Sequence, residues 1–185
     1  MVKRDLIRYS VVILMGIIAL FALGKFYMST IRVRSDDANL FLKANDVLIY
    51  NRQESPKVND FVVYKVAGKK YISRIIAKGG DAVTSMDDVL YINGIVKPEP
   101  YIEPLKAEYL RETNHQSNFT SDFNLEAISN MPKGRVAKNH FWVLNDNRQD
   151  EQDSRQFGEI DRSQIKGVLT FRLLPLDTFG FLENQ

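Results

Sequence analysis

The stretch that decides the fold class is residues 60–77, which read Asp60-Phe-Val-Val-Tyr-Lys-Val66, then Ala67-Gly68-Lys69, then Lys70-Tyr-Ile-Ser-Arg-Ile-Ile-Ala77. Two runs rich in β-branched and aromatic residues flank a short segment that contains glycine. This pattern is typical of two antiparallel strands joined as a hairpin. Gly79-Gly80-Asp81 follows and indicates a break in the chain.

Similar runs occur on both sides of this hairpin. Asn93-Gly94 separates two of them, and this pair favours a tight β-hairpin because both residues tolerate positive φ. No long 3.6-residue pattern follows Met28, so the sequence predicts a mainly β, antiparallel domain without a parallel βαβ unit. The further predicted strands are Val47-Leu-Ile-Tyr50, Val89-Leu-Tyr-Ile92, Ile95-Val-Lys97, His140-Phe-Trp-Val-Leu144 and Val168-Leu-Thr-Phe-Arg-Leu173.

Two segments lack strand character. Residues 29–45 mix charged and apolar residues without a sustained period, and we interpret them as a connector into a domain over residues 46–185. Residues 101–135 are polar and rich in Asn, Ser and Pro, which predicts an irregular, partly mobile insertion in that domain.

The N-terminal segment, positions 1–28, has the pattern of a membrane anchor. Val11 to Met28 spans 18 positions when Lys25 is allowed to reach the interface, which is just enough to cross a bilayer. Lys3, Arg4 and Arg8 precede this segment and favour a cytoplasmic N-terminus with the domain outside the cell. Basic residues on the far side of the segment weaken this prediction of the orientation. The predicted location is therefore a single-pass protein of the cell membrane.

Two other interpretations of this segment stay open. Its strictly apolar core runs only from Val11 to Leu23, which is short for a span, and Ala22-Leu-Gly24 fits a cleavage site. The segment can therefore also be a removable signal peptide. A third interpretation is a buried helix of a soluble protein.

Composition excludes several classes of function. The chain has 185 residues and no cysteine, which rules out disulfides, thiolate catalysis and cysteine-based metal sites. Its net charge is only +2 and no arginine-rich tract is present, so the sequence argues against a nucleic-acid partner.

The most unusual stretch is Leu144-Asn-Asp-Asn-Arg-Gln-Asp-Glu-Gln-Asp-Ser-Arg155, which directly follows an apolar strand. A solvated loop is one interpretation, and a turn in which Asp and Arg brace one another by charge-assisted hydrogen bonds is another. A calcium loop needs acidic or Asn residues at alternate positions, and Arg148 interrupts that pattern. We predict neither a metal site nor a cofactor. The candidate structural residues of this turn are Asp146, Asn147, Arg148, Asp153, Ser154 and Arg155.

Taken together, these motifs resemble the type I signal peptidases. Asp146-Asn-Arg148 with Asp153-Ser-Arg155 resembles the family's Gly-Asp-Asn-Arg…Asp-Ser-Arg motif. Arg74-Ile-Ile-Ala-Lys-Gly-Gly-Asp81 and Leu90-Tyr-Ile-Asn-Gly94 resemble two more family segments, in the same order. The resemblance covers nearly the whole chain and implies a membrane-anchored, antiparallel β domain.

The resemblance also implies where the catalytic residues should be. The family uses a Ser nucleophile activated by a neutral Lys base. In this sequence Asp37 takes the Ser position and Ser73 takes the Lys position, while the Met, Pro and Thr around the nucleophile are missing. In the turn, Asn145 and Glu151 replace the family's Gly and Ser. Loss of either member of such a pair costs orders of magnitude in rate.

Other interpretations of the sequence keep a hydrolytic mechanism. Ser35 lies two residues before Asp37 and could be a nucleophile after a small shift in register, with Lys69, Lys70 or Lys78 as an unorthodox base. Hydrolysis by Asp37 lacks a partner carboxylate placed by any motif. The two histidines, His115 and His140, are poorly placed for a Ser-His-Asp triad.

The leading hypothesis is a signal peptidase-like protein without peptidase activity. Related proteins with such substitutions occur in pilus gene clusters of Gram-positive bacteria, so the resemblance implies an accessory or chaperone-like role with pilin and sortase proteins. An anchored β domain could hold an extended peptide by adding it to a strand edge. The alternative is a divergent active signal peptidase that removes signal peptides from secreted proteins.

Overall fold

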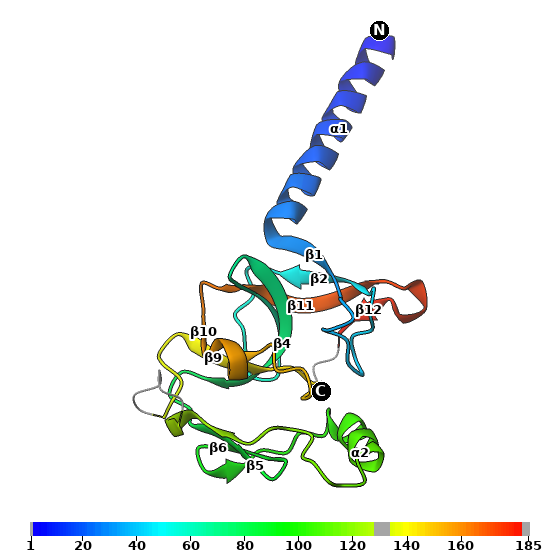
Figure 1. Cartoon of the computed structure of the whole chain (residues 1–185). Coiled ribbons are helices and arrows are strands. Elements are labelled where there is room, and N and C mark those ends of the chain that lie inside the picture. The colour runs from blue at the N-terminus through cyan, green and yellow to red at the C-terminus, as the bar shows by residue number, and fades with distance from the viewer. Residues whose placement is uncertain (1, 128–133, 183–185) are drawn as a thin grey trace.

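The protein consists of a long N-terminal helix followed by a β domain with two antiparallel sheets (Figure 1). The computed structural model describes residues 2–127 and 134–182; within the first helix the side chains of residues 7–18, 24, 26 and 27 are described. The predicted mainly β, antiparallel fold class is confirmed. Residues 128–133, a part of the predicted insertion, lie outside the described residues.

The large sheet carries the core of the domain. Among the described residues its strand order is β1-β2-β11-β3-β4-β9-β10, and β12 pairs with β11. Its strands are β1 (Met28–Arg32), β2 (Val47–Asn51), β3 (Phe61–Val66), β4 (Lys69–Lys78), β9 (His140–Leu144), β10 (Ile160–Asp161), β11 (Ile165–Leu174) and β12 (Gly180–Phe181).

The small sheet has the order β7-β6-β5-β8 within the described part of the chain. Its strands are β5 (Val83–Met86), β6 (Val89–Ile92), β7 (Ile95–Val96) and β8 (Phe123–Asn124). The short helices of the domain are α2 (Glu103–Glu112), η1 (Leu125–Ala127), α3 (Ser154–Phe157) and η2 (Leu176–Thr178).

Both predicted hairpins are present, and their turns explain why. Ala67 and Gly68 connect β3 to β4 with φ of 47° and 86°. Asn93 and Gly94 connect β6 to β7 with φ of 54° and 77°. Positive φ at both central residues matches the right-handed twist of the paired strands.

Strand β4 lies in the middle of the large sheet and is covered on both faces. Ile72 packs in a cluster with Val63 and Leu48, whereas Tyr71 and Ile75 pack in a second cluster on the other side. Buried polar groups in such a strand must find hydrogen-bond partners inside the protein. This requirement fixes the surroundings of Ser73 and Arg74, the two polar residues in the buried part of β4.

Two predictions about irregular segments need correction. The predicted connector over residues 29–45 begins with strand β1, which pairs with β2 over its full length. The predicted insertion contains the ten-residue helix α2. None of the residues of α2 is fully buried; Leu105 and Tyr109 pack partly against Tyr101 and Phe119, so its apolar stripe is too narrow to give a clear helical period.

The helix α1 (Val2–Tyr27) extends away from the β domain (Figure 1). Its 26 residues give a length of about 39 Å. Its described apolar side chains, from Ile7 to Ile18, are at least half exposed, and none joins the buried clusters of the domain. No helix in the described part of the chain meets the length and apolarity expected of a membrane span.

Candidate functional site

The polar turn of residues 145–153 follows β9 and leads into α3. Because β9 pairs with β4 so that Leu144 lies opposite Arg74, the first residues of the turn meet Ser73 and Arg74. The large sheet thus brings together two sequence motifs that lie far apart in the chain. A candidate site forms at this junction.

The Arg74 guanidinium forms a bidentate ion pair with Asp146. Its Nε donates to Oδ1 at 2.9 Å and its Nη2 donates to Oδ2 at 2.7 Å. Both side chains are at most 1% exposed. The rings of Phe61 and Tyr101 lie 4.0 and 4.1 Å from the guanidinium carbon, so the charge is held between two aromatic faces.

Arg148 is fully buried and ties the turn to residues outside it. Its Nη1 donates to the carbonyl oxygen of Asn145 at 2.7 Å, and its Nη2 pairs with Glu99. Burial alone would lower the pKa of Arg148, but Glu99 and the other nearby acidic groups raise it overall. The guanidinium therefore stays charged inside the protein.

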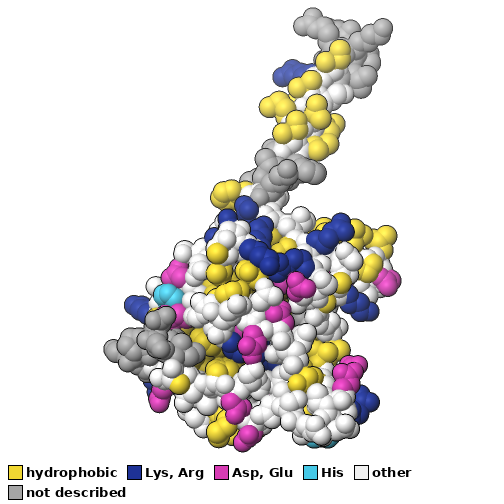
Figure 2. Space-filling model, in the orientation of Figure 1, with side chains coloured by type: hydrophobic (Ala, Val, Ile, Leu, Met, Phe, Trp, Pro, Cys, Tyr) yellow, Lys and Arg dark blue, Asp and Glu magenta, His cyan; other side chains and the backbone are white. Residues whose placement is uncertain are grey.

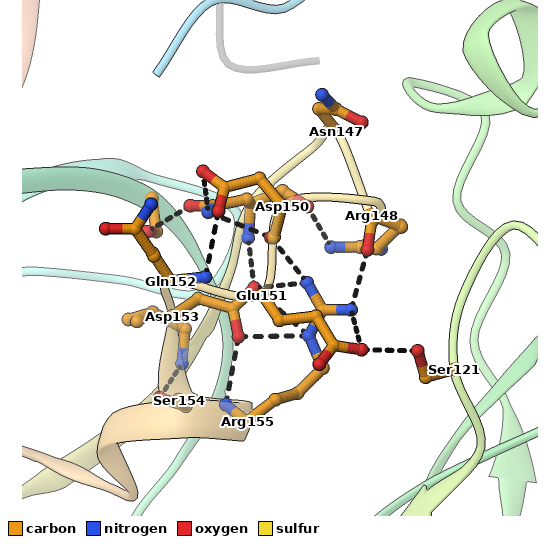
Figure 3. A network of polar contacts seen from close by, with 12 residues as sticks. Ser121, Asn147, Arg148, Asp150, Glu151, Gln152, Asp153, Ser154 and Arg155 are labelled. Atoms are coloured by element: carbon orange, nitrogen blue, oxygen red, sulfur yellow. Dashed lines mark hydrogen bonds and ion pairs between the residues drawn. The ribbon is translucent and has the colours of Figure 1, made fainter. Parts of the chain in front are cut away.

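Asp153 organises the end of the turn (Figure 3). Its carboxylate accepts from the backbone nitrogens of Asn145 and Arg155, both at 2.9 Å, and pairs with the Arg155 guanidinium at 2.7 Å. Arg155 also donates to the carbonyl oxygens of Arg148 and Asp150. The hydroxyl of Ser154 accepts from the Val143 nitrogen at 2.9 Å.

The expected bracing between Asp and Arg residues is only partly internal to the turn. Asp153 and Arg155 pair with each other, whereas Asp146 pairs with Arg74 and Arg148 with Glu99. Figure 3 shows Asn147 turned away from this network, while Glu151 reaches Ser121. The turn is thus a buried polar junction and not a solvated loop; its contribution to stability stays a prediction.

Beside the turn is a small, solvent-open cleft that contains Asp37 and Ser73, the two positions that the family resemblance aligns with catalytic residues. Asp37 comes from the segment between β1 and β2, and Ser73 comes from β4. The residues around the cleft are Asp36, Asp37, Ala38, Asn39, Phe61, Ile72, Ser73, Asn145, Asp146 and Asn147.

Ser73 is held in a chain of hydrogen bonds at the bottom of the cleft. It is 1% exposed, and its hydroxyl donates to Oδ1 of Asn145 at 2.6 Å. The Tyr64 hydroxyl lies 3.0 Å from the Ser73 oxygen and is placed to donate to it. Burial raises the pKa of Tyr64 well above its ordinary value, so this phenol remains protonated. Neither hydroxyl is prepared to accept a proton as a general base.

Asp37 is engaged by a nearby cation. Its two carboxylate oxygens accept from Nε and Nη2 of Arg34 at 2.8 and 3.1 Å. The Asp37 side chain is 7% exposed, and that of Arg34 is 34% exposed. The negative charge of Asp37 is therefore largely balanced by Arg34, three positions earlier.

Among the described contacts, no hydrogen bond joins Ser35 to one of the candidate lysines. Ser35 is exposed and its hydroxyl donates to Asp36 at 3.3 Å. Lys70 donates to the Tyr50 hydroxyl at 3.1 Å, and Lys69 lies over the ring of Tyr71. Among the described residues that line the cleft, none is a lysine. Across the described ranges, no cluster of three His, Asp or Glu side chains is arranged to hold a metal ion.

Sequence reasoning missed three partners of the site: Arg34, Tyr64 and Glu99. Arg34 could have been found, because Arg and Asp three residues apart can meet across a turn. Tyr64 and Glu99 carried no such signal, because they reach the site only through sheet pairing and the fold of the small-sheet region.

Comparisons with known proteins point to one family. The family model described as "Signal peptidase, peptidase S26" matches residues 6–174. Signal peptidase IB of Staphylococcus aureus (strain MRSA252) is 30% identical over 189 residues, which cover 98% of this chain and 96% of the relative. Signal peptidase I of Bacillus caldolyticus is 37% identical over 123 residues, covering 66% of this chain and 64% of the relative.

A solved structure has the same fold in its matched part. The signal peptidase I from Enterococcus faecalis V583 superposes with a TM-score of 0.57 and 33% sequence identity, covering 63% of this chain and 98% of that one. The match of the family model, the identity over almost the full length and the shared fold lead to one conclusion. This chain belongs to the signal peptidase family, peptidase S26.

Proposed function

We propose that this protein is a membrane-anchored signal peptidase-like factor that does not cut peptides. The observation that carries the proposal is the state of the cleft: Asp37 is paired with Arg34, and Ser73 donates its hydrogen bond to Asn145. Acyl transfer needs a nucleophile and a base in contact, and an anionic Asp37 opposes the negative charge that develops on the substrate oxygen.

A cleavage assay tests this proposal directly. The full-length protein in detergent is incubated with a signal-peptide substrate, with Signal peptidase IB of S. aureus as the positive control. We expect cleavage at the background rate, and the same rate for Asp37→Ala and Ser35→Ala. An enzyme-like rate that either substitution abolishes would overturn the proposal and establish the alternative, a divergent active signal peptidase.

The proposed role is an accessory or chaperone-like one in the assembly of surface pili, with pilin and sortase proteins as partners. Support comes from a retained scaffold whose two catalytic positions are both changed, and from exposed strand edges that could receive an extended peptide. Deletion of the gene should reduce the high-mass pilin polymers of the cell wall, and the parent gene supplied in trans should restore them. Unchanged polymers in the deletion strain would exclude this role.

The proposed location is the cell membrane, with residues 1–28 as cytoplasmic tip and anchor and the rest of the chain outside. The exposed apolar side chains of α1 and the basic residues before them support this arrangement. N-terminal sequencing of the mature protein should begin at the original N-terminus. A sequence that begins at Lys25 would instead show a cleaved signal peptide.

A further inference from the structure

A basic hollow lies on the β domain close to the end of α1. It is lined by Tyr50, Arg52, Lys65, Lys70, Ile165 and Lys166, and it is open to solvent. Figure 2 shows Lys and Arg side chains gathered on the part of the domain that adjoins α1. The hollow shares no lining residue with the cleft of Asp37 and Ser73.

The backbone fixes this hollow next to the helix. The nitrogen of Arg52 donates to the carbonyl oxygen of Tyr27, the last residue of α1, at 2.9 Å. In the β1–β2 pair, Tyr50 lies opposite Ser29, two residues after α1 ends. A bilayer that contains α1 would therefore have its surface beside the hollow.

By itself, the arrangement of the lysines lowers the stability of the folded protein. Lys65 and Lys70 lie directly opposite each other across the β3–β4 pair, where like charges repel. Within the described residues, none of the four cations of the hollow forms an ion pair with a carboxylate. Lys70 instead donates to the Tyr50 hydroxyl, and Lys166 to the carbonyl oxygen of Ser163. The hollow thus holds uncompensated positive charge.

The pKa of Tyr50 reflects the positive charge of this hollow. Burial of Tyr50 would raise the pKa of the phenol, but hydrogen bonds from Lys70 and Ser29 and the charge of Lys70 lower it overall. The surroundings therefore stabilise an anionic oxygen. A phosphate group presents such oxygens, and lysines bind it as point charges without needing a fixed orientation.

We infer that the hollow formed by Arg52, Lys65, Lys70 and Lys166 binds the phosphate headgroups of anionic phospholipids and holds the β domain against the membrane. Four cations at the exit of an anchor form a basic cluster of the kind that anionic lipid attracts, with each charge contributing about fivefold to binding. The inference rests on the proposed insertion of α1, and it is independent of whether the protein cuts peptides.

The test uses the full-length chain in lipid nanodiscs. Because the chain has no cysteine, Gln53→Cys beside the hollow gives a single site for a fluorescent donor, and the acceptors are carried by lipid headgroups. Energy transfer is measured in discs with phosphatidylglycerol and in discs with phosphatidylcholine only. We expect stronger transfer in the anionic discs, and we expect added salt to remove the difference.

Two matched variants locate the effect. The triple change Lys65→Gln, Lys70→Gln and Lys166→Gln should lower the ratio of docked to undocked domain by about 100-fold in anionic discs. The control triple change is Lys78→Gln, Lys97→Gln and Lys138→Gln, which removes equal charge elsewhere and should leave the signal as in the parent. Lys→Arg at the three positions of the hollow keeps the charge and should also keep the signal, which separates charge loss from misfolding.

Several results would overturn the inference. Equal transfer in anionic and neutral discs would do so, as would an equal loss in the control triple variant. Full competition by millimolar inorganic phosphate at constant ionic strength would assign the hollow to a soluble anion. A chain that enters neither kind of disc would refute the anchor and this inference with it, whereas insertion without lipid-dependent docking would refute the inference alone.

Discussion

Residues of the polar turn after β9 line part of the cleft beside it. The turn and the cleft differ in the partners that their polar groups bind. In the turn, the buried charges of Arg74, Asp146 and Arg148 each meet an opposite charge or a carbonyl oxygen. In the cleft, Asp37 pairs with the partly exposed Arg34, and Ser73 donates to Asn145. The difference is that the Arg74–Asp146 pair is fully buried, whereas the Asp37–Arg34 pair of the cleft reaches solvent.

The largest expected effect is on the turn. Asp153→Ala should lower the free energy of unfolding by about 3 kcal/mol or more, because it removes the carboxylate that pairs with the buried Arg155 guanidinium and accepts from the Asn145 nitrogen. Arg148→Ala should have a similar effect, because it leaves the Glu99 carboxylate with the Tyr101 hydroxyl but without its cation. Urea unfolding followed by circular dichroism measures both.

Asp177→Ala is the matched control, because Asp177 is exposed in η2 and should change stability by less than about 0.5 kcal/mol. If Asp153→Ala and Arg148→Ala unfold at the same urea concentration as the parent, the turn does not stabilise the fold, and the contrast between the turn and the cleft is wrong.

The next effect is a loss of stability in alkali. Burial raises the pKa of Tyr64 above the ordinary value of 10.0, so above that pH the unfolded chain releases a proton that the folded chain retains. Stability should therefore be complete below pH 10 and fall as the pH rises further, by up to about 1.4 kcal/mol per pH unit for this tyrosine.

Tyr64→Phe should remove the share of Tyr64 from this slope, and Tyr101→Phe beside the turn should act in the same direction because burial and Glu99 raise the pKa of Tyr101 too. Urea midpoints at about pH 9 and about pH 11 give the slopes. A parent protein that is equally stable at both values would contradict the buried, protonated state of these phenols.

A smaller effect on stability is expected at Asp37. Asp37→Ala should cost about 1 kcal/mol or less, because its partner Arg34 is partly exposed and water can replace the ion pair. The same substitution at Asp153 serves as the reference, measured by the same urea unfolding. A loss at Asp37 as large as that at Asp153 would mean that the cleft is as structural as the turn.

The smallest effect is expected from restoring the dyad. The double change Asp37→Ser and Ser73→Lys should leave cleavage of a signal peptide at background, because residues around the nucleophile are also changed and misplacement by about 1 Å can cost about 100-fold in rate. The control is the parent protein in the same assay. Clear cleavage by the double variant that Ser35→Ala does not affect would show that the scaffold still positions substrate for chemistry.

Much of the fold was readable from local pattern. The β3–β4 and β6–β7 hairpins follow from runs rich in β-branched and aromatic residues around short turns that contain glycine, and β9 and β11 from further runs of this kind. Strand β1 was missed because Met28–Arg32 carries only two large apolar residues and lies at the sheet edge, where one face stays in water. Helix α2 was missed because it buries too little apolar surface to show its period.

By itself, the sequence determined the antiparallel β class and the family, because these depend on local propensity and motif order. The alignment of Asp37 and Ser73 with the family's catalytic positions stays a prediction. Only the tertiary structure decided the partners of those residues. Arg34 meets Asp37 through a local turn, but Ser73 meets Tyr64 through the β3–β4 pair and Asn145 through the β4–β9 pair. Strand pairing joins positions that are far apart in the chain, and a buried polar atom binds whichever partner the finished sheet places beside it.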